Sequence, residues 1–396
     1  MKVLQINSVY GFGSTGKIVA DIHQNCLNKG IESYVIYSRN QVDNNQMKNV
    51  YRFYDALGFY KHVILGVLFD KHGLYSKNNT KKIINKIEEI NPDIVHIHNI
   101  HGFYCNYPML LDYLKNKKVI WTLHDCWAYT GFCAHYDYNE CCQWRENKCV
   151  KCKYRNNYPY RVLSHSKENF KIKEEIYKQL NPILVTPSKW LKDELSNSML
   201  HNKTCRVVNN AVNLADFFQE KNEEFLLKYH LNEKKIYLTV SNYWTKQKGF
   251  EEYMKLSKLL NDNEVIVMIG CSRNQLNKLP KNIIGFSRVD KNELRKWYSN
   301  AAAFVNLTLE DNYPTVNLEA QACGLPVFTY KSGGSTEMVK NKEYICEKYN
   351  INQMIELVRN DSLINQHNNI KLENNENRMF LEYYAIYEEL YKTNNQ

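Results

Sequence analysis

Short apolar runs alternate with segments of helical periodicity along the chain. Runs of strand length lie at 2–7, 33–37, 94–97, 119–123 and 183–186, and the alternation resumes at 236–240, 264–269, 302–307 and 327–330. Short apolar runs between helical patterns are typical of parallel strands, which are buried on both faces. A polar, turn-rich stretch at 209–217, a predicted hinge, separates the two series. The pattern therefore predicts an α/β protein with two Rossmann-like domains.

The expected domains are residues 1–212, residues 213–375 and a last segment, 376–396, whose apolar residues recur at helical spacing. The most apolar window, 56–69, is too short to span a bilayer and contains Lys61 and His62. We expect a buried helix there. An amphipathic helix lying on a membrane surface is the alternative.

Two acids surround the start of a predicted helix in the second half. Asp311 follows the apolar run 301–307, Pro314 occupies a position favoured for a first helical residue, and Glu319 lies about two turns further on. A loop acid beside helix amides at the carboxyl end of a strand forms a site for a phosphorylated, polyhydroxylated ligand. By spacing alone, an exposed acidic loop in an ordinary βαβ unit is an equal alternative.

Glycine-rich residues 11–17 follow the first predicted strand and have the spacing of a P-loop. Ile18 stands where a P-loop needs a hydroxyl for Mg²⁺, and no glycine follows Gly13 at the position that the dinucleotide fingerprint requires. What the segment predicts is a loop whose amides approach a phosphate, ahead of a helix beginning near Lys17.

A basic loop follows the predicted strand 236–240. Lys246 and Lys248 precede Gly249, after which a helix is expected. A lysine at this point suits a diphosphate as counter-ion. Two solvated surface lysines are the alternative.

The composition, with 44% hydrophobic and 24% charged residues among 396, is that of a folded protein. The formal net charge of +10 suits an anionic nucleotide or membrane face, and no nucleic-acid motif accompanies it. Residues 1–7 read as a strand and not as a signal peptide, so we expect a cytoplasmic protein.

Half of the 12 cysteines fall between 126 and 152. The set Cys133, Cys142, Cys149 and Cys152 predicts a structural four-thiolate zinc site, in which Cys126 or Cys141 could substitute. Free thiols are the second interpretation, and disulfides the last in a reducing compartment.

Together these motifs resemble the retaining nucleotide-sugar glycosyltransferases of family 4. Asp311 and Glu319 match the family's acid-x7-acid motif, with aspartate replacing the first glutamate and Glu310 as the neighbouring candidate. Lys248 and its glycine match the basic loop, although Asn242 replaces the arginine six residues before the lysine.

Further segments resemble the same family. Residues 333–337 match a glycine-rich turn, 285–288 a segment beside the nucleotide base, and 13–16 the loop that faces the diphosphate. His124, after the run 119–123, matches a histidine at the donor sugar, although a strand-end histidine is often only a satisfied polar residue. His96, His98 and His101 are expected to serve packing or the acceptor side. The cysteine-rich insert resembles a bacterial capsule and exopolysaccharide subgroup of colanic-acid type.

The resemblance implies a GT-B fold, two domains facing across a cleft with a last helix returning to the first. It implies retaining transfer from a nucleoside-diphosphate sugar to a capsule, exopolysaccharide or O-antigen acceptor, a glycan or lipid-linked oligosaccharide, with no catalytic metal. Peripheral membrane association is expected, and nucleic acid is not. A sugar-nucleotide epimerase and a decayed, zinc-stabilised scaffold are the alternatives. The implied catalytic residues are His124, Asp311 and Glu319, and the implied donor contacts are Gly13, Ser14, Gly16, Lys246, Lys248, Arg288, Pro314, Thr315, Val316 and Glu319.

Overall fold

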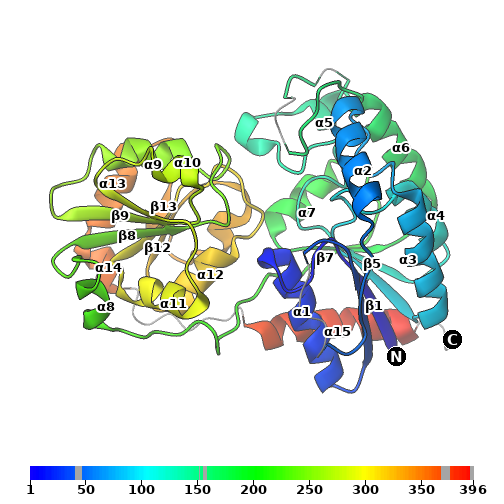
Figure 1. The fold of residues 1–396 in the computed structure, drawn as a ribbon, viewed down its shortest axis with the longest axis horizontal. Helices are drawn as coiled ribbons and strands as arrows, with labels where there is room; N and C mark the ends of the chain where they lie inside the picture. The colour runs from blue at the N-terminus through cyan, green and yellow to red at the C-terminus, as the bar shows by residue number, and fades with distance from the viewer. Residues whose placement is uncertain (41–46, 151, 155–157, 367–374, 393–396) are drawn as a thin grey trace. The chain divides into compact units, whose positions relative to one another are not determined.

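The computed structural model describes residues 1–40, 47–150, 152–154, 158–366 and 375–392 (Figure 1). Their contacts divide the chain into two compact units. The first comprises Met1–Asn209 and Met379–Gln396, and the second comprises Asn210–Arg378. The chain thus passes from one unit to the next at the start of the polar stretch 209–217.

The first unit is built on a seven-stranded parallel sheet. Its strands are β1 (Lys2–Ile6), β2 (Glu32–Tyr37), β3 (Val50–Arg52), β4 (Ile94–Ile97), β5 (Val119–Thr122), β6 (Ile183–Thr186) and β7 (Cys205–Val207). They lie in the order β3-β2-β1-β4-β5-β6-β7. The register pairs Leu4 with Tyr34 on one side and with Val95 on the other. The apolar runs of the sequence supply the five central strands.

Helices cover this sheet. They are α1 (Gly13–Asn28), α2 (Ala56–Phe69), α3 (Lys77–Ile90), α4 (Tyr107–Leu114), α5 (Gln143–Glu146), α6 (Ser166–Gln179) and α7 (Lys189–Ser196). The expected start of α1 near Lys17 is wrong, because the helix begins at Gly13. Gly11 N donates to Gly16 O at 2.9 Å, which closes the loop tightly over the first turn.

Helix α2 occupies the window 56–69, but the expectation that it is buried is wrong. Only His62 and Gly66 of this helix are buried. Periodicity located the helix, whereas the tertiary contacts left one side of it facing solvent. None of the helices in the described ranges is long and apolar enough to cross a bilayer.

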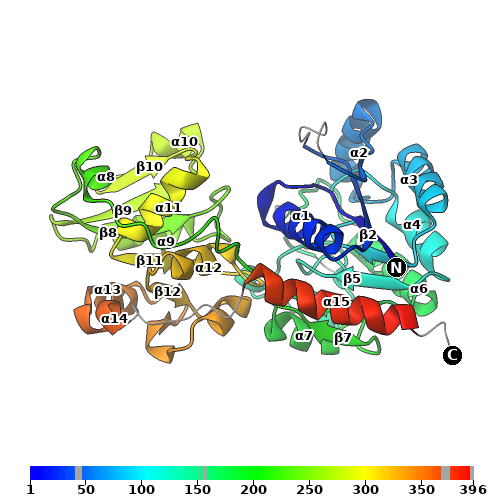
Figure 2. The same cartoon turned by 90° about the horizontal axis from the view of Figure 1, so that it is seen from below.

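The last helix, α15 (Glu376–Lys392), returns to the first unit and lies across its sheet (Figures 1 and 2). Tyr387 OH lies 2.7 Å from His96 Nδ1, and Tyr383 OH lies 3.1 Å from Thr122 Oγ1. These buried hydrogen bonds join the helix to β4 and β5. They also give His96 a packing role.

The second unit has a six-stranded parallel sheet. Its strands are β8 (Lys235–Val240), β9 (Glu264–Ile269), β10 (Ile283–Phe286), β11 (Ala303–Asn306), β12 (Val327–Tyr330) and β13 (Ile345–Cys346). The order is β10-β9-β8-β11-β12-β13. The accompanying helices are α8 (Glu223–Leu227), α9 (Phe250–Ser257), α10 (Arg273–Leu276), α11 (Lys291–Asn300), α12 (Thr315–Ala322), α13 (Ile351–Arg359) and α14 (Asp361–Gln366).

Candidate active site

The strand order of the second unit creates a switch point between β8 and β11. Strand β9, which follows β8 in the chain, pairs with one edge of β8, and the later strand β11 pairs with its other edge. Loops diverge at such a point, and ligands of open α/β sheets bind there, beyond the carboxyl ends of the strands. Lys248 lies in the loop after β8, and Asp311 lies in the loop after β11.

The two side chains form an ion pair. Lys248 Nζ lies 2.5 Å from Asp311 Oδ2, with the side chains 23% and 19% exposed. Burial by itself lowers the pKa of Lys248, but the Asp311 carboxylate outweighs it, so this pKa is raised above its usual value. The ammonium therefore remains charged at neutral pH. A cation and a hydroxyl-accepting carboxylate stand together at the switch point.

The loop after β8 is fastened to the loop after β11. Leu309 N donates to Gln247 O at 2.8 Å, and Gln247 Nε2 donates to Glu310 O at 2.9 Å. Gly249 has φ +76°, and a Cβ there would lie 2.1 Å from Leu307 O. Only glycine fits this close approach. These contacts fix the position of the lysine that precedes Gly249.

A third loop, after β12, supports Asp311 from its other side. Gly334 N donates to Asp311 O at 2.9 Å, and Ser332 Oγ donates to Thr308 O at 2.7 Å. A Cβ on Gly333, which has φ +52°, would lie 2.2 Å from Asp311 O. The glycine-rich turn seen in the sequence thus lets the two loops meet.

The neighbouring acids Glu310 and Asp311 have different surroundings. Glu310 is fully buried, whereas Asp311 lies partly exposed and holds Lys248. A ligand can reach Asp311 without opening the loop. This difference supports Asp311 as the first acid of the motif.

Glu319 lies on α12 and is held by a tyrosine that the sequence analysis missed. Tyr298 OH, on α11, donates to Glu319 Oε2 at 3.0 Å. Tyr298 is fully buried, and burial raises the pKa of its hydroxyl well above the usual value, so it stays a donor. Tyr298 stands in a helical segment outside the motifs, so no prediction was made for it from the sequence.

Helix α12 begins one residue later than expected. Pro314 is the N-cap, with φ −70° and ψ 114°, and the helix starts at Thr315. Its extended ψ excludes Pro314 from the helix itself. Thr315 and Val316 therefore supply first-turn amides, at the end of the helix where the peptide dipoles favour negative charge.

Two other predicted donor residues of this unit lie apart from the ion pair. Lys246 is exposed in the loop after β8. Arg288 is exposed beyond β10, which β9 separates from β8. The structure brings neither into contact with Lys248 or Asp311 among the described residues.

The glycine loop of the first unit forms the N-terminus of α1. Gly13 and Ser14 lie in the first helical turn, and the N-cap, Phe12, makes no side-chain capping bond. A Cβ on Gly16 would lie 3.1 Å from Val9 Cγ2, so this residue packs closely under the turn. Amides of this turn can still receive an anion.

His124 follows β5 and is paired with His98. His98 Nδ1 lies 3.0 Å from His124 Nε2, and His98 Nε2 lies 3.2 Å from Gln5 Oε1. Burial lowers the pKa of His124 to about 4, so the ring is neutral at pH 7. Gln5 Oε1 can only accept, so His98 Nε2 carries the proton and donates to it. The other ring nitrogen of the neutral His98, Nδ1, therefore accepts, and His124 Nε2 is the donor. Nδ1 of His124 is consequently an acceptor.

His101 forms a second pair. From the sequence it was expected to serve packing or the acceptor side. His101 Nε2 lies 2.7 Å from Asp125 Oδ2, and Trp127 N donates to Asp125 Oδ1 at 2.9 Å. Burial raises the pKa of Asp125, but His101 and the backbone outweigh it and hold the pKa at about 2. The recess lined by these residues and His124 holds about 10 Å³, room for about one water. The pair is a fixed support of the loop after β5.

The cysteines of the insert do not gather as the spacing predicted. Cys142 is exposed and interacts with Glu146, apart from the other three. Cys141 is partly buried; burial chiefly raises its pKa and the Cys152 thiol adds to the shift, and Cys141 adds in turn to the raised pKa of the buried Cys149. Cys142 is the N-cap of α5 and is exposed, whereas the adjacent Cys141 is partly buried.

Cys133 and Cys152 form a hydrogen-bonded pair. Arg161 Nη2 donates to Cys152 Sγ at 2.6 Å. The bond from Cys133 and the guanidinium lower the pKa of Cys152 to about 5. In the described ranges no three His, Cys, Asp or Glu side chains already stand at metal-binding geometry.

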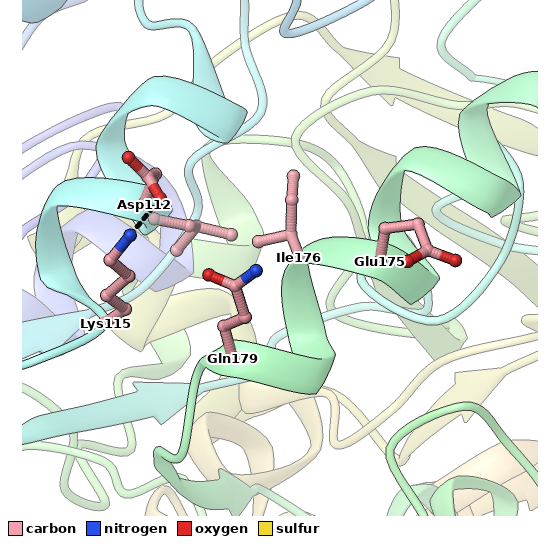
Figure 3. A pocket seen from close by; sticks show the side chains of 6 residues that line it. Asp112, Lys115, Glu175, Ile176 and Gln179 are labelled. Atoms are coloured by element: carbon pink, nitrogen blue, oxygen red, sulfur yellow. Dashed lines mark hydrogen bonds and ion pairs between the residues drawn. The ribbon is translucent and has the colours of Figure 1, made fainter.

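A surface hollow of about 150 Å³ lies between α4 and α6 and contains none of the predicted site residues (Figure 3). Its ion pair, Lys115 with Asp112, is largely solvent exposed, and such pairs contribute little. We assign no function to this hollow.

The fold and site define a GT-B glycosyltransferase. In comparisons with known proteins, residues 15–216 match the model of Glycosyltransferase Family 4, and residues 221–377 match that of glycosyl transferases group 1. The first match covers just over half of the chain. The chain belongs to glycosyltransferase family 4, and it is a nucleotide-sugar-dependent glycosyltransferase.

Among curated proteins the chain is 23% identical to WcaC of Escherichia coli K12, over 86% of this chain and 85% of that one. A glycosyl transferase role in colanic acid biosynthesis is ascribed to WcaC. Sucrose-phosphate synthase of Thermosynechococcus elongatus has a TM-score of 0.71 at 13% identity, covering 99% of both chains. HepE of Anabaena, in complex with UDP-glucose, has a TM-score of 0.68 at 10% identity, covering 98% of this chain and 100% of that one. At these identities the solved structures support the fold alone.

Proposed function

We propose that the protein transfers a sugar from a nucleoside diphosphate to a surface-polysaccharide acceptor, with retention of the anomeric configuration. The observation that carries the donor half is the Lys248–Asp311 pair at the switch point, beside the N-terminus of α12. Similarity to WcaC, to which a role in colanic acid biosynthesis is ascribed, supports a polysaccharide acceptor, and we propose that it is a glycan or a lipid-linked oligosaccharide. Such an acceptor also supports peripheral association with a membrane.

In this proposal Lys248 and the first amides of α12 neutralise the diphosphate. Negative charge grows on that group as the bond from the anomeric carbon to the phosphate oxygen breaks, so these preorganised groups act most strongly in the transition state. Asp311 accepts hydrogen bonds from sugar hydroxyls, and Glu319 accepts them from the ribose. The acceptor hydroxyl forms the new bond on the same face and gives its proton to the leaving phosphate. This scheme assigns no step to a metal ion.

For His124 we propose a contact with the transferred sugar. The tautomer set by His98 presents Nδ1 as an acceptor, and the low pKa keeps the ring uncharged. His124 is therefore suited to accept a bond from a sugar hydroxyl and not to donate a proton. The amides of Gly13 and Ser14 are proposed to lie near the donor phosphates.

Thermal-shift measurements with UDP-, GDP- and dTDP-sugars test the donor assignment. One nucleotide series should raise the melting temperature, because a ligand that binds only the folded state stabilises it by about 2.7 kcal/mol at about 100 times its Kd. The shift should persist in EDTA. The absence of a shift with every donor, together with no sugar transfer, would leave a scaffold, whereas donor isomerisation without an acceptor would identify an epimerase.

Structural zinc remains a proposal, now with Cys133, Cys141, Cys149 and Cys152 as the ligands. The buried side chains of Arg161 and Lys173 adjoin these thiols, and burial lowers the pKa of Lys173 to about 7. A zinc ion with four thiolates carries a net charge of about −2, which the Arg161 guanidinium and a protonated Lys173 would offset, and buried charges require partners of this kind. Small side-chain rotations of the thiols would have to accompany binding.

Adjacent cysteines provide a matched test of this site. Cys141→Ser should abolish bound zinc and lower both the melting temperature and the soluble yield, since metal binding contributes to folding. Cys142→Ser, at the adjacent but exposed cysteine, should leave the bound zinc, the melting temperature and the soluble yield unchanged. Elemental analysis of protein purified without added metal should find about one zinc per chain. Much less zinc, with all four thiols titratable in the folded protein, would exclude the metal.

A further inference from the structure

Helix α2, labelled in Figure 1, carries several exposed apolar side chains. Leu57, Tyr60 and Ile64 are 86%, 62% and 57% exposed, and Leu68 follows at 41%. Their spacing of three and four residues places them on one side of the helix. A contiguous apolar surface of this kind on a folded protein marks an interaction site.

A second segment extends the stripe. Val162 N donates to Val67 O at 2.8 Å, and Leu163 N donates to Leu68 O at 3.2 Å, so this segment lies against the end of α2. Tyr160 is 58% exposed, and Val162 and Leu163 are about half exposed. We call the exposed side of α2 together with residues 160–163 the α2 face.

The opposite side of α2 is well fixed. His62 Nδ1 lies 2.8 Å from Ser76 Oγ, and Gly73 N donates to His62 Nε2 at 2.8 Å. A Cβ on Gly66 would come within 3.3 Å of His72 Nδ1. At the end of the helix Asp70 Oδ2 accepts from the backbone at residue 165. The exposed side therefore belongs to a helix with a defined orientation.

The exposed charged side chains on α2 and directly after it are lysines. Lys61 lies on α2 itself and is exposed, and Lys71 follows the helix and is exposed. Within 54–82 the acids are Asp55, the N-cap, and the buried Asp70, and residues 158–167 contain no acid. An apolar helical stripe with lysines beside it suits the boundary between anionic headgroups and acyl chains. A protein partner would not require lysines beside the apolar stripe.

We propose that the α2 face is a membrane-docking surface that lies on an anionic lipid bilayer and inserts Leu57, Ile64 and Leu68 below the headgroups. The inference rests on the proposed peripheral association and locates it in the structure. Helix α2 lies in the plane of the interface and does not cross the membrane. Docking would bring the first unit to lipid-linked acceptors.

Vesicle flotation of the full chain, without donor or acceptor, tests this surface. The protein should float with vesicles of phosphatidylcholine containing about 30% phosphatidylglycerol, and less with phosphatidylcholine alone or in about 0.5 M salt. The double variant Leu57→Glu, Ile64→Glu should reduce partition about tenfold or more, and Lys61→Glu should reduce it on anionic vesicles only. Leu381→Glu, at a 52% exposed leucine of α15, is the matched control and should float like the parent.

Each variant is first compared with the parent by its melting temperature and its donor-induced thermal shift. An unchanged shift shows that folding and the donor site are intact, so a lost membrane interaction is distinguished from a failed transferase assignment. A parent protein that floats with neither vesicle, or equal flotation of the double variant and the parent, would overturn the proposal. Light scattering that shows a dimer dissociated by Leu57→Glu, Ile64→Glu, without flotation of the parent, would make the face a self-interface instead.

Discussion

Replacing Lys248 with alanine is expected to lower kcat/KM for sugar transfer by about 30-fold to about 1,000-fold. This corresponds to about 2 to 4 kcal/mol, the usual cost of losing one preorganised electrostatic partner of the transition state. The reason is that Lys248 remains charged and is proposed, together with the first amides of α12, to neutralise the charge that develops on the leaving diphosphate. Steady-state kinetics with the donor found by thermal shift measures the effect.

Lys235→Ala is the control for this experiment. Lys235 is 24% exposed, close to the 23% of Lys248, and lies 2.9 Å from Asp361, which is 80% exposed; it stands at the amino end of β8. Its loss should leave kcat/KM within about twofold of the parent. Equal losses for Lys235→Ala and Lys248→Ala would refute the donor assignment. In the same assay Asp311→Asn should impair transfer more than Glu310→Gln, which would identify the first motif acid.

Replacing Glu319 with glutamine is expected to weaken donor binding by about 10-fold to about 150-fold. The carboxylate is proposed to accept ribose hydroxyls, and hydrogen bonds to a charged group are worth about 1.5–3 kcal/mol. Because the contact lies away from the breaking bond, KM for the donor should rise more than kcat falls. Tyr298→Phe should produce a smaller change in the same direction, since it removes only the group that orients Glu319.

Glu293→Gln is a matched control, because Glu293 also accepts from a tyrosine, Tyr229 OH, at 2.6 Å in the same unit. Its donor affinity should equal that of the parent. A donor Kd that Glu319→Gln leaves unchanged in calorimetric titration would contradict the role of this acid. Loss of kcat alone would move Glu319 from ribose binding to the reacting centre.

Much of the fold could be predicted from local patterns. The runs at 94–97, 183–186, 264–269 and 327–330 became strands with those bounds, because each is apolar enough to be buried on both faces. The edge strands β3, β7, β10 and β13 were missed. They are short, and β3 and β7 contain Arg52 and Arg206, so only pairing with a neighbour defines them.

Part of the candidate site could also be predicted from local patterns. Lys248 and Asp311 each follow an apolar run, which places each at the carboxyl end of a strand. Their 2.5 Å contact depends on β11 lying next to β8, although the two residues are 63 positions apart. Tyr298 was missed and His98 was expected to serve packing or the acceptor side, because the polar role of a buried residue depends on a partner from another segment.

The sequence by itself determined that the chain forms two α/β halves, that acids and lysines stand at strand ends, and that residues 56–69 are helical. Local periodicity and turn residues suffice for these features, since they depend on neighbours along the chain. Only the tertiary structure decided that Lys248 pairs with Asp311, that Cys142 is exposed while Cys141 is partly buried, and that α2 leaves its apolar side exposed. Each of these depends on strand order or on packing between distant segments, which periodicity within one segment does not encode.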